Sequence, residues 1–171
     1  AVIGVSGGTI PVTKITNSTI SSNDEHGVYC DCYRLTGSIT VSDNTITGNG
    51  SSGIDTGGGD SGGSHTFVFT NNIVSNNAGT GINGNANGTQ TITGNIVKNN
   101  GVYGIRTRGN GTYTIQNNTI IGNTGRGVVG LYATHIIDSN TIVSNGGGIR
   151  ISQGGSYTIT GNLIARNTAT D

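Results

Sequence analysis

The densest group of ionisable side chains in the sequence is the run Asp24, Glu25 and His26. A histidine beside carboxylates can remove a proton from a carbon next to a carboxyl group and return it, provided that the groups lie within hydrogen-bonding reach of the substrate. A solvated polar turn contains the same residue types and does no chemistry. The mutual geometry of the three side chains decides between the two interpretations.

A second set of candidates follows a repeated Gly-aliphatic pair, of which Gly27-Val28 is the first copy. Side chains alternate along a strand, so the residue after each pair is expected to face outward on one ridge. Arginines on such a ridge can bind an acidic sugar chain through paired hydrogen bonds to its carboxylates, and a mixed solvated face is the alternative. The candidate glycan-binding residues are Tyr29, Asp55, Asn83, Arg106, Arg108 and Arg150, and Val129 occupies the remaining place on the ridge.

Cys30 and Cys32 are the two cysteines of the chain. A metal half-site, a local disulfide and two free thiols are all compatible with this spacing. A disulfide between residues i and i+2 requires a turn, because in an extended strand their Cα atoms lie near or beyond the limit for bridging. The sequence contains no second cysteine pair to complete a zinc site, so we predict no metal and no other cofactor.

A repeated sequence pattern determines where the strands and turns that carry these residues are expected. The pattern Asn-x-(Ile/Val)-x-x-Asn occurs six times, a seventh copy begins with Ser18, and the closing asparagines recur every 22 to 28 residues. An apolar residue precedes each copy by three positions, and a Gly-aliphatic pair follows all but the last. Each repeat therefore has three short apolar segments between Gly/Asn turns. One repeat cannot bury these residues alone, but stacked repeats bury them all.

The sequence thus predicts an all-β chain, a single-stranded parallel β-helix of about seven coils over residues 1–171, which form a single domain. It resembles the right-handed parallel β-helix repeat family, which includes polysaccharide lyases, alginate epimerases, nitrous-oxide-reductase maturation proteins and many cell-surface proteins. The resemblance implies a right-handed solenoid and no particular activity, because this fold supports many functions. The Asp24–His26 run is similar only in part to the Asp-Pro-His-Glu element of the epimerases, since the order differs and the proline is absent. One buried column is predicted, formed by Ile20, Ile46, Val74, Val97, Ile120, Ile142 and Ile164.

Asparagines recur at both ends of the repeated pattern. Asparagine tolerates left-handed turns, and stacked amides form hydrogen-bonded ladders, so a structural role is favoured over ligand binding. The predicted ladder residues are Asn44, Asn72, Asn95, Asn118, Asn140 and Asn162, together with Asn23, Asn49, Asn77, Asn100, Asn123, Asn145 and Asn167.

The strand before each asparagine pattern has outward positions rich in Ser and Thr, 15 of 21 over the seven repeats. A flat Thr grid resembles the surface of ice-binding proteins. Ordinary β-propensity and a lateral packing face are the alternatives, and Val68, Gln116, Ile136 and Asp138 interrupt the grid. Sequons for N-glycosylation occur at Asn17, Asn49, Asn87, Asn110 and Asn117.

The 171 residues carry no net charge, so no global field favours nucleic acid, and no apolar run approaches a membrane span. The charge is nevertheless split. Residues 1–85 hold two basic and six acidic side chains, a net −4, and residues 86–171 hold the reverse, a net +4. Both ends read as uncapped. Because the sequence has no methionine, we expect a processed N-terminus and an extracellular or cell-surface location.

Three functions follow from these observations. The first is a non-catalytic structural solenoid that assembles head-to-tail with copies of itself. The second is a polysaccharide-binding or polysaccharide-modifying module of the lyase or epimerase kind. The third is ice binding. The absence of complete catalytic motifs and the split of charge favour the first.

Overall fold

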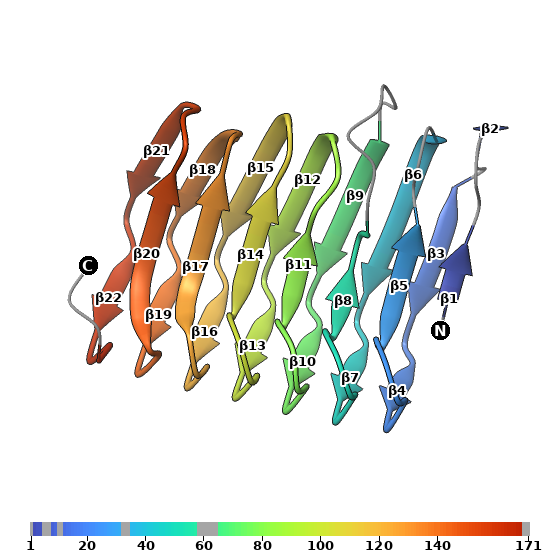
Figure 1. Ribbon diagram of the computed structural model, residues 1–171, viewed down its shortest axis with the longest axis horizontal. Coiled ribbons are helices and arrows are strands. Elements are labelled where there is room, and N and C mark those ends of the chain that lie inside the picture. The colour runs from blue at the N-terminus through green and yellow to red at the C-terminus, as the bar shows by residue number, and fades with distance from the viewer. Residues whose placement is uncertain (1, 5–7, 10–11, 32–34, 58–64, 169–171) are drawn as a thin grey trace.

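A computed structural model describes residues 2–4, 8–9, 12–31, 35–57 and 65–168. Every regular element in these ranges is a β-strand. The strands stack in coils along one axis, from the N-terminal to the C-terminal end of the molecule (Figure 1). All strand pairs are parallel, and each pairs a strand with its counterpart in the next coil. The predicted β-helix with three short parallel strands per coil is therefore confirmed.

Three parallel sheets run the length of the stack. Sheet 1 contains β1 (Val2–Gly4), β5 (Val28–Asp31), β8 (Ile54–Asp55), β11 (Ile82–Gly84), β14 (Ile105–Arg108), β17 (Arg126–Leu131) and β20 (Gly147–Ser152). Sheet 2 contains β4 (Thr19–Ser21), β7 (Thr45–Thr47), β10 (Ile73–Ser75), β13 (Ile96–Lys98), β16 (Thr119–Ile121), β19 (Thr141–Val143) and β22 (Leu163–Ala165). Sheet 3 contains β2 (Gly8–Thr9), β6 (Leu35–Ser42), β9 (His65–Thr70), β12 (Gly88–Thr93), β15 (Gly111–Gln116), β18 (Thr134–Asp138) and β21 (Tyr157–Thr160), and β3 (Thr13–Thr16) pairs with β6.

The core is a set of aliphatic columns, one from each sheet. The predicted column of sheet 2 is in register from Ile20 to Ile164, and its five inner members are fully buried. Ile164, in the last described coil, differs from the prediction, because 45% of its surface is exposed. Since side chains alternate along a strand, each three-residue strand of sheet 2 contributes only its central residue to the core.

The two asparagine ladders form as predicted. In the inner coils, each amide oxygen accepts hydrogen bonds from the backbone N–H and the Nδ2 of the asparagine in the preceding coil. Asn95 N and Nδ2, for example, donate to Asn118 Oδ1 at 2.9 and 3.0 Å. Each Nδ2 also donates to a backbone carbonyl of the preceding coil, as Asn118 Nδ2 does to Ile92 O at 2.8 Å. The ladders thus satisfy buried polar groups at two of the corners.

The left-handed turns lie one residue earlier than the sequence interpretation placed them. The residue before each ladder member has positive φ, for example Asn71 at 56° and Gly94 at 69°, whereas the ladder asparagines are not in this conformation. This region favours Gly and Asn. The ladder asparagines are instead selected for their inward amide groups.

Sheet 3 places three polar side chains in the interior, which the sequence reading did not anticipate. Gln90, Tyr113 and His135 are in register on successive strands, and all three are fully buried. Small residues of sheet 1 face them: a Cβ on Gly84 would lie 2.3 Å from Gln90 Oε1, and one on Gly130 would lie 2.7 Å from His135 Nε2. Large side chains on one sheet are thus matched by glycine on the other.

The interior position of His135 predicts acid sensitivity. Its Nε2 lies 2.9 Å from Thr107 Oγ1, and the Tyr113 ring stacks on it at 5.4 Å, so no negative charge balances an imidazolium there. Burial lowers the pKa of His135 below its ordinary value of 6.5. Because the unfolded chain takes up a proton below that value while the folded chain does not, stability should be constant above about pH 6.5 and fall as the pH drops further.

Urea unfolding at about pH 7.5 and about pH 5.5 measures this effect. A His135→Gln variant should lose less stability between the two pH values than the wild-type protein, although His65, whose pKa burial also lowers, contributes a drop of the same sign in both. An equal loss in the two proteins would show that His135 does not contribute to the acid sensitivity.

Candidate functional site

The residues predicted to form an outward ridge on sheet 1 are in register, although Asp55 and Val129 are only 7% and 6% exposed. Asp55 pairs with Tyr29 and with Asn83, Asn83 pairs with Arg106, and Val129 separates Arg106 from Arg150 in the register. These residues therefore form one column along the helix axis, with one side chain per coil. Neighbouring strands in a sheet are about 4.8 Å apart, so the column is a regularly spaced row of side chains.

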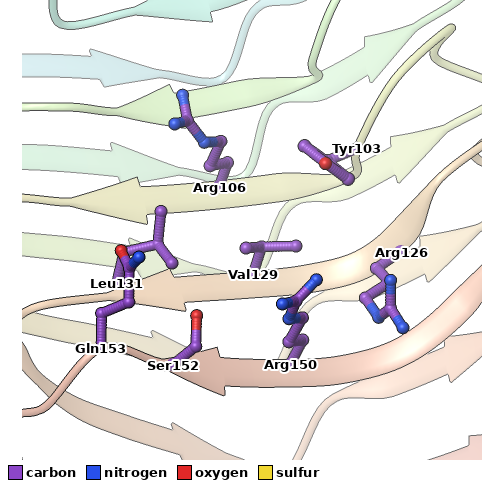
Figure 2. A pocket seen from close by; sticks show the side chains of 8 residues that line it. All are labelled: Tyr103, Arg106, Arg126, Val129, Leu131, Arg150, Ser152 and Gln153. Atoms are coloured by element: carbon purple, nitrogen blue, oxygen red, sulfur yellow. The ribbon is translucent and has the colours of Figure 1, made fainter. Parts of the chain in front are cut away.

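A shallow hollow of about 250 Å³ lies at the C-terminal half of this column. Figure 2 shows that Arg106, Val129 and Arg150 come from three successive strands, while Arg126 lies at the beginning of β17. The lining residues are Tyr103, Arg106, Arg126, Val129, Leu131, Arg150, Ser152 and Gln153. Three guanidinium groups and no acidic residue line the hollow, so its local potential is positive although the whole chain is neutral.

The N-terminal half of the column contains an acidic side chain, Asp55, and polar contacts link it to its neighbours. His26 Nδ1 lies 3.7 Å from Asp55 Oδ2, and the His26 ring stacks on Tyr29 at 5.1 Å. Asn83 Nδ2 donates to Asp55 Oδ2 at 2.9 Å, and Arg106 donates to Asn83 Oδ1 at 3.5 Å. Burial raises the pKa of the Asp55 carboxyl above its ordinary value, and the hydrogen bond from Asn83 and the nearby His26 oppose that rise.

The structure does not assemble the predicted Asp24, Glu25 and His26 cluster. Asp24 and Glu25 are exposed, and the carboxylate beside His26 belongs to Asp55 in the next coil. Residues one coil apart lie at strand spacing, which brings His26 and Asp55 together. Within the described ranges, no group of three or more His, Cys, Asp or Glu residues is arranged to hold a metal ion.

Arg108 is separated from the arginine-lined hollow. It is exposed, and its guanidinium carbon lies 6.0 Å from the centre of the Tyr132 ring, in a neighbouring hollow formed with Gly109 and Asn110. Of the six predicted glycan-binding residues, the structure therefore brings Arg106 and Arg150 together in one hollow.

The comparisons with known proteins agree with this architecture. The family model for the right-handed β-helix region matches residues 1–168. The chain belongs to the right-handed β-helix family. Searches of curated proteins and of solved structures gave no match. The family assignment establishes the fold and its handedness, and leaves the function of this β-helix to be argued from its surface.

The predicted Thr face of the β-helix is the outer face of sheet 3. The register aligns its hydroxyl residues in columns, one of which contains Thr66, Thr89, Thr112 and Thr134. The interruptions fall within the same grid: Val68 and Ile136 occupy the central column, and Asp138 accepts a hydrogen bond from Thr160 at 2.7 Å. Ice binding by this face stays a prediction.

The sequons of the β-helix differ in accessibility. Asn17, Asn110 and Asn117 are exposed, and Asn87 lies one coil from Asn110, whose backbone N–H donates to Asn87 Oδ1 at 2.7 Å. Asn49 is buried, and its Oδ1 accepts from Asn23 at 2.8 Å. The folded β-helix therefore leaves no room for a glycan on Asn49, contrary to its prediction as a glycosylation site.

Cys30 is disulfide-bonded, so the free-thiol and metal-ligand alternatives do not apply to it. Cys32 lies outside the described residues. The described part of the chain contains no helix that is long and apolar enough to cross a membrane.

Sequence reasoning missed Tyr103 and Arg126 as lining residues. Each precedes a Gly-aliphatic pair, Gly104-Ile105 and Gly127-Val128, and they lie in adjacent coils, where Gly104 N donates to Arg126 O at 3.0 Å. The signal in the sequence was that both residues occupy the same position, directly before the Gly-aliphatic pair, in consecutive repeats. It was overlooked because only the residue after the pair was expected to face outward.

Proposed function

We propose that this β-helix binds an acidic polysaccharide along the outer face of sheet 1 and does not cleave it. The observation that supports this proposal is the hollow lined by Arg106, Arg126 and Arg150 and by no acidic residue. A guanidinium group donates two parallel hydrogen bonds to a carboxylate, so clustered arginines favour carboxylated or otherwise anionic ligands.

The remaining lining residues favour a sugar over a free inorganic anion. Leu131, which is half-buried, supplies apolar surface for the carbon face of a sugar ring, and Ser152 and Gln153 supply groups for its hydroxyls. Binding pockets for whole small molecules usually measure about 300–1,000 Å³. A hollow of about 250 Å³ on a regular column is better suited to a short part of a polymer that continues along the face.

The arrangement of ionisable groups supports binding without turnover. An epimerase or lyase needs its proton-transfer groups at the same sugar whose carboxylate the arginines hold. Here Asp55 on β8 and Arg106 on β14 are two strands apart in sheet 1, or about 10 Å. His26 and Asp55 therefore do not face the sugars whose carboxylates Arg106 and Arg150 would hold.

Replacing the arginines of the hollow tests the proposal. The Arg106→Ala/Arg150→Ala double variant should bind polygalacturonate, alginate or hyaluronan at least about 100-fold more weakly, because each lost charged hydrogen-bond donor costs about 1.5–3 kcal/mol. Titration calorimetry measures the affinity, and assays for unsaturated products and for epimer composition should show an unchanged polymer.

Arg108→Ala is the control, since it removes one positive charge from the neighbouring hollow with Tyr132, as each of the two single substitutions, Arg106→Ala and Arg150→Ala, does in the arginine-lined hollow. It should lower the affinity by less than about threefold, as expected for an exposed charge outside the site. If Arg108→Ala lowered the affinity as much as the double variant does, the binding would depend on general charge attraction and not on the arginine-lined hollow. Unsaturated products, or an altered epimer ratio that disappears in His26→Ala, would contradict binding without turnover.

We propose head-to-tail assembly as a second function, supported by the opposite charges of the two halves of the chain, by the direction of the asparagine ladder and by exposed apolar side chains in the last described coil. Ile159, Leu163 and Ile164 are 41%, 58% and 45% exposed there, although the residues in register with Ile159 and Ile164 one coil earlier are fully buried. The asparagine ladder also has a direction, since each member donates towards the C-terminal end. Asn145 Nδ2 donates to Asn167 Oδ1 at 3.2 Å, and Asn23 Nδ2 donates to Asn49 Oδ1 at 2.8 Å.

In such an assembly, the Asn167 amide of one copy would donate to the Asn23 oxygen of the next copy and set the register between them. The acidic half, residues 1–85, would meet the basic half, residues 86–171, of its neighbour. Heterologous contacts of this kind do not close, so they produce filaments. The disulfide-bonded state of Cys30 supports an oxidising, extracellular location for them.

Light scattering after size-exclusion chromatography, with negative-stain imaging at low and high salt, tests the assembly. The wild-type protein should form species larger than a monomer, and an Ile159→Lys/Ile164→Lys variant should remain monomeric because it places charges among the exposed apolar side chains of the last described coil. Ile136→Lys is the control, since Ile136 is 36% exposed but faces outward from sheet 3. A wild-type protein that stays monomeric at every salt and protein concentration would contradict the assembly.

A further inference from the structure

We infer that the polysaccharide carries its carboxylates on alternate sugars, an inference that rests on the proposed function. The column on sheet 1 runs along the helix axis as Asn83, Arg106, Val129 and Arg150, one residue per strand. A polymer that follows this column meets the side chains in that order. Arg106 and Arg150 are separated by two strand spacings, about 10 Å, and Figure 2 shows Val129 on the strand between them.

Val129 is poorly suited to an acidic sugar. It is 6% exposed, and its side chain is apolar. A sugar carboxylate placed over Val129 would lose bound water and gain no hydrogen bond from this side chain, and the loss of hydration is unfavourable. Arg126 is at the side of the hollow, at the beginning of β17, rather than in the column (Figure 2). A neutral sugar over Val129 avoids this cost, and acidic sugars on either side reach Arg106 and Arg150.

The next positions towards the N-terminus limit the site to about four sugars. Asn83 presents an amide, which is suited to hydroxyl or acetamido groups of a neutral sugar, and its Nδ2 already donates to Asp55 Oδ2 at 2.9 Å. The Asp55 carboxyl follows on the adjacent strand, where it disfavours a further acidic sugar. The order of subsites from Asn83 to Arg150 is therefore neutral, acidic, neutral, acidic.

Two tetrasaccharides test this order by titration calorimetry. One alternates glucuronic acid with N-acetylglucosamine and carries two carboxylates; the other consists of four galacturonic acids. The alternating tetrasaccharide should bind the wild-type protein about tenfold more tightly, the effect of roughly one unpaired buried polar group. General charge attraction predicts the reverse, since the second ligand carries twice the charge.

A gain-of-function variant sharpens the test. Val129→Arg completes a row of three arginines, so it should strengthen binding of the tetragalacturonate about tenfold and leave the alternating ligand within about threefold of its wild-type affinity. Val129→Gln, which adds a polar side chain without charge, is the control and should not produce that gain. Circular dichroism establishes that the variants fold, and the wild-type comparison stands without them.

The outcomes separate this inference from the proposed function. If neither tetrasaccharide nor any acidic polymer binds the wild-type protein, the proposed function fails, and the inference fails with it. If acidic polymers bind through Arg106 and Arg150 but the tetragalacturonate binds the wild-type protein as tightly as the alternating ligand or more tightly, the inference alone is overturned.

Discussion

Gly104→Ala should destabilise the β-helix by at least about 3 kcal/mol, which is a large part of the stability of a typical domain. The added Cβ would lie 2.5 Å from Ile120 Cγ2 and 2.7 Å from Gly127 O. Neither neighbour can move away easily. Ile120 is fully buried in the sheet 2 column, and the backbone around Gly127 is held by the hydrogen bond from Gly104 N to Arg126 O at 3.0 Å. Urea unfolding monitored by circular dichroism measures the loss.

Gly48→Ala is the control for backbone conformation alone. Its Cβ would meet nothing within 4 Å, but its φ of +66° is unfavourable for alanine, so a loss of about 1 kcal/mol is expected. If both substitutions cost the same, close approach between coils is not the reason for glycine at position 104. The same contacts recur at Gly53, Gly81 and Gly127, where an added Cβ would lie 2.4 Å from an aliphatic side chain.

Asn118→Ala should cost about 3–5 kcal/mol, the second large effect. Asn95 N and Nδ2 lose their acceptor, and Ile92 O and Asn140 Oδ1 lose a donor. These groups lie in a fully buried ladder, where each polar group left without a partner costs about 1–3 kcal/mol. Chemical denaturation again gives the magnitude, and the cooperativity of unfolding shows whether the stack separates at this coil.

The exposed neighbour Thr119 supplies the comparison, because Thr119→Ala should change the stability by less than about 0.5 kcal/mol. Asn118→Asp is a second informative variant. It retains an oxygen that can accept from Asn95 but cannot donate to Ile92 O, so its loss should also be large. An alanine variant as stable as the wild-type protein would mean that water replaces the amide in the ladder.

The glycines and the asparagine ladders together explain why the outer face of sheet 1 has a uniform spacing. Two corners of the coil are fixed by contacts that permit one distance between successive coils, as the 2.9 to 3.0 Å bonds between Asn95, Asn118 and Asn140 illustrate. A face on which side chains recur at a fixed interval can match the repeat of a polymer. The stability predictions and the binding proposals thus concern the same feature of the fold.

The sequence alone determined the fold, the register and the two ladders. Asparagine, isoleucine and glycine recur at intervals of 22 to 28 residues, and a stacked solenoid is the arrangement in which all the repeats bury their apolar residues and pair their strands. The column from Tyr29 to Arg150 followed from the same spacing, because side-chain alternation along a strand sets which residues face outward.

The tertiary structure decided what the repeat does not encode. His26 Nδ1 lies 3.7 Å from Asp55 Oδ2, because strand stacking brings residues 29 positions apart in the sequence into contact. Tyr113 and His135 are interior, since the facing positions Thr107 and Gly130 are small enough to admit them. Arg126 joins Arg106 and Arg150 from a different repeat position, so the hollow exists only where three coils stack. Such features depend on contacts between non-equivalent positions of successive repeats, and periodicity carries no information about them.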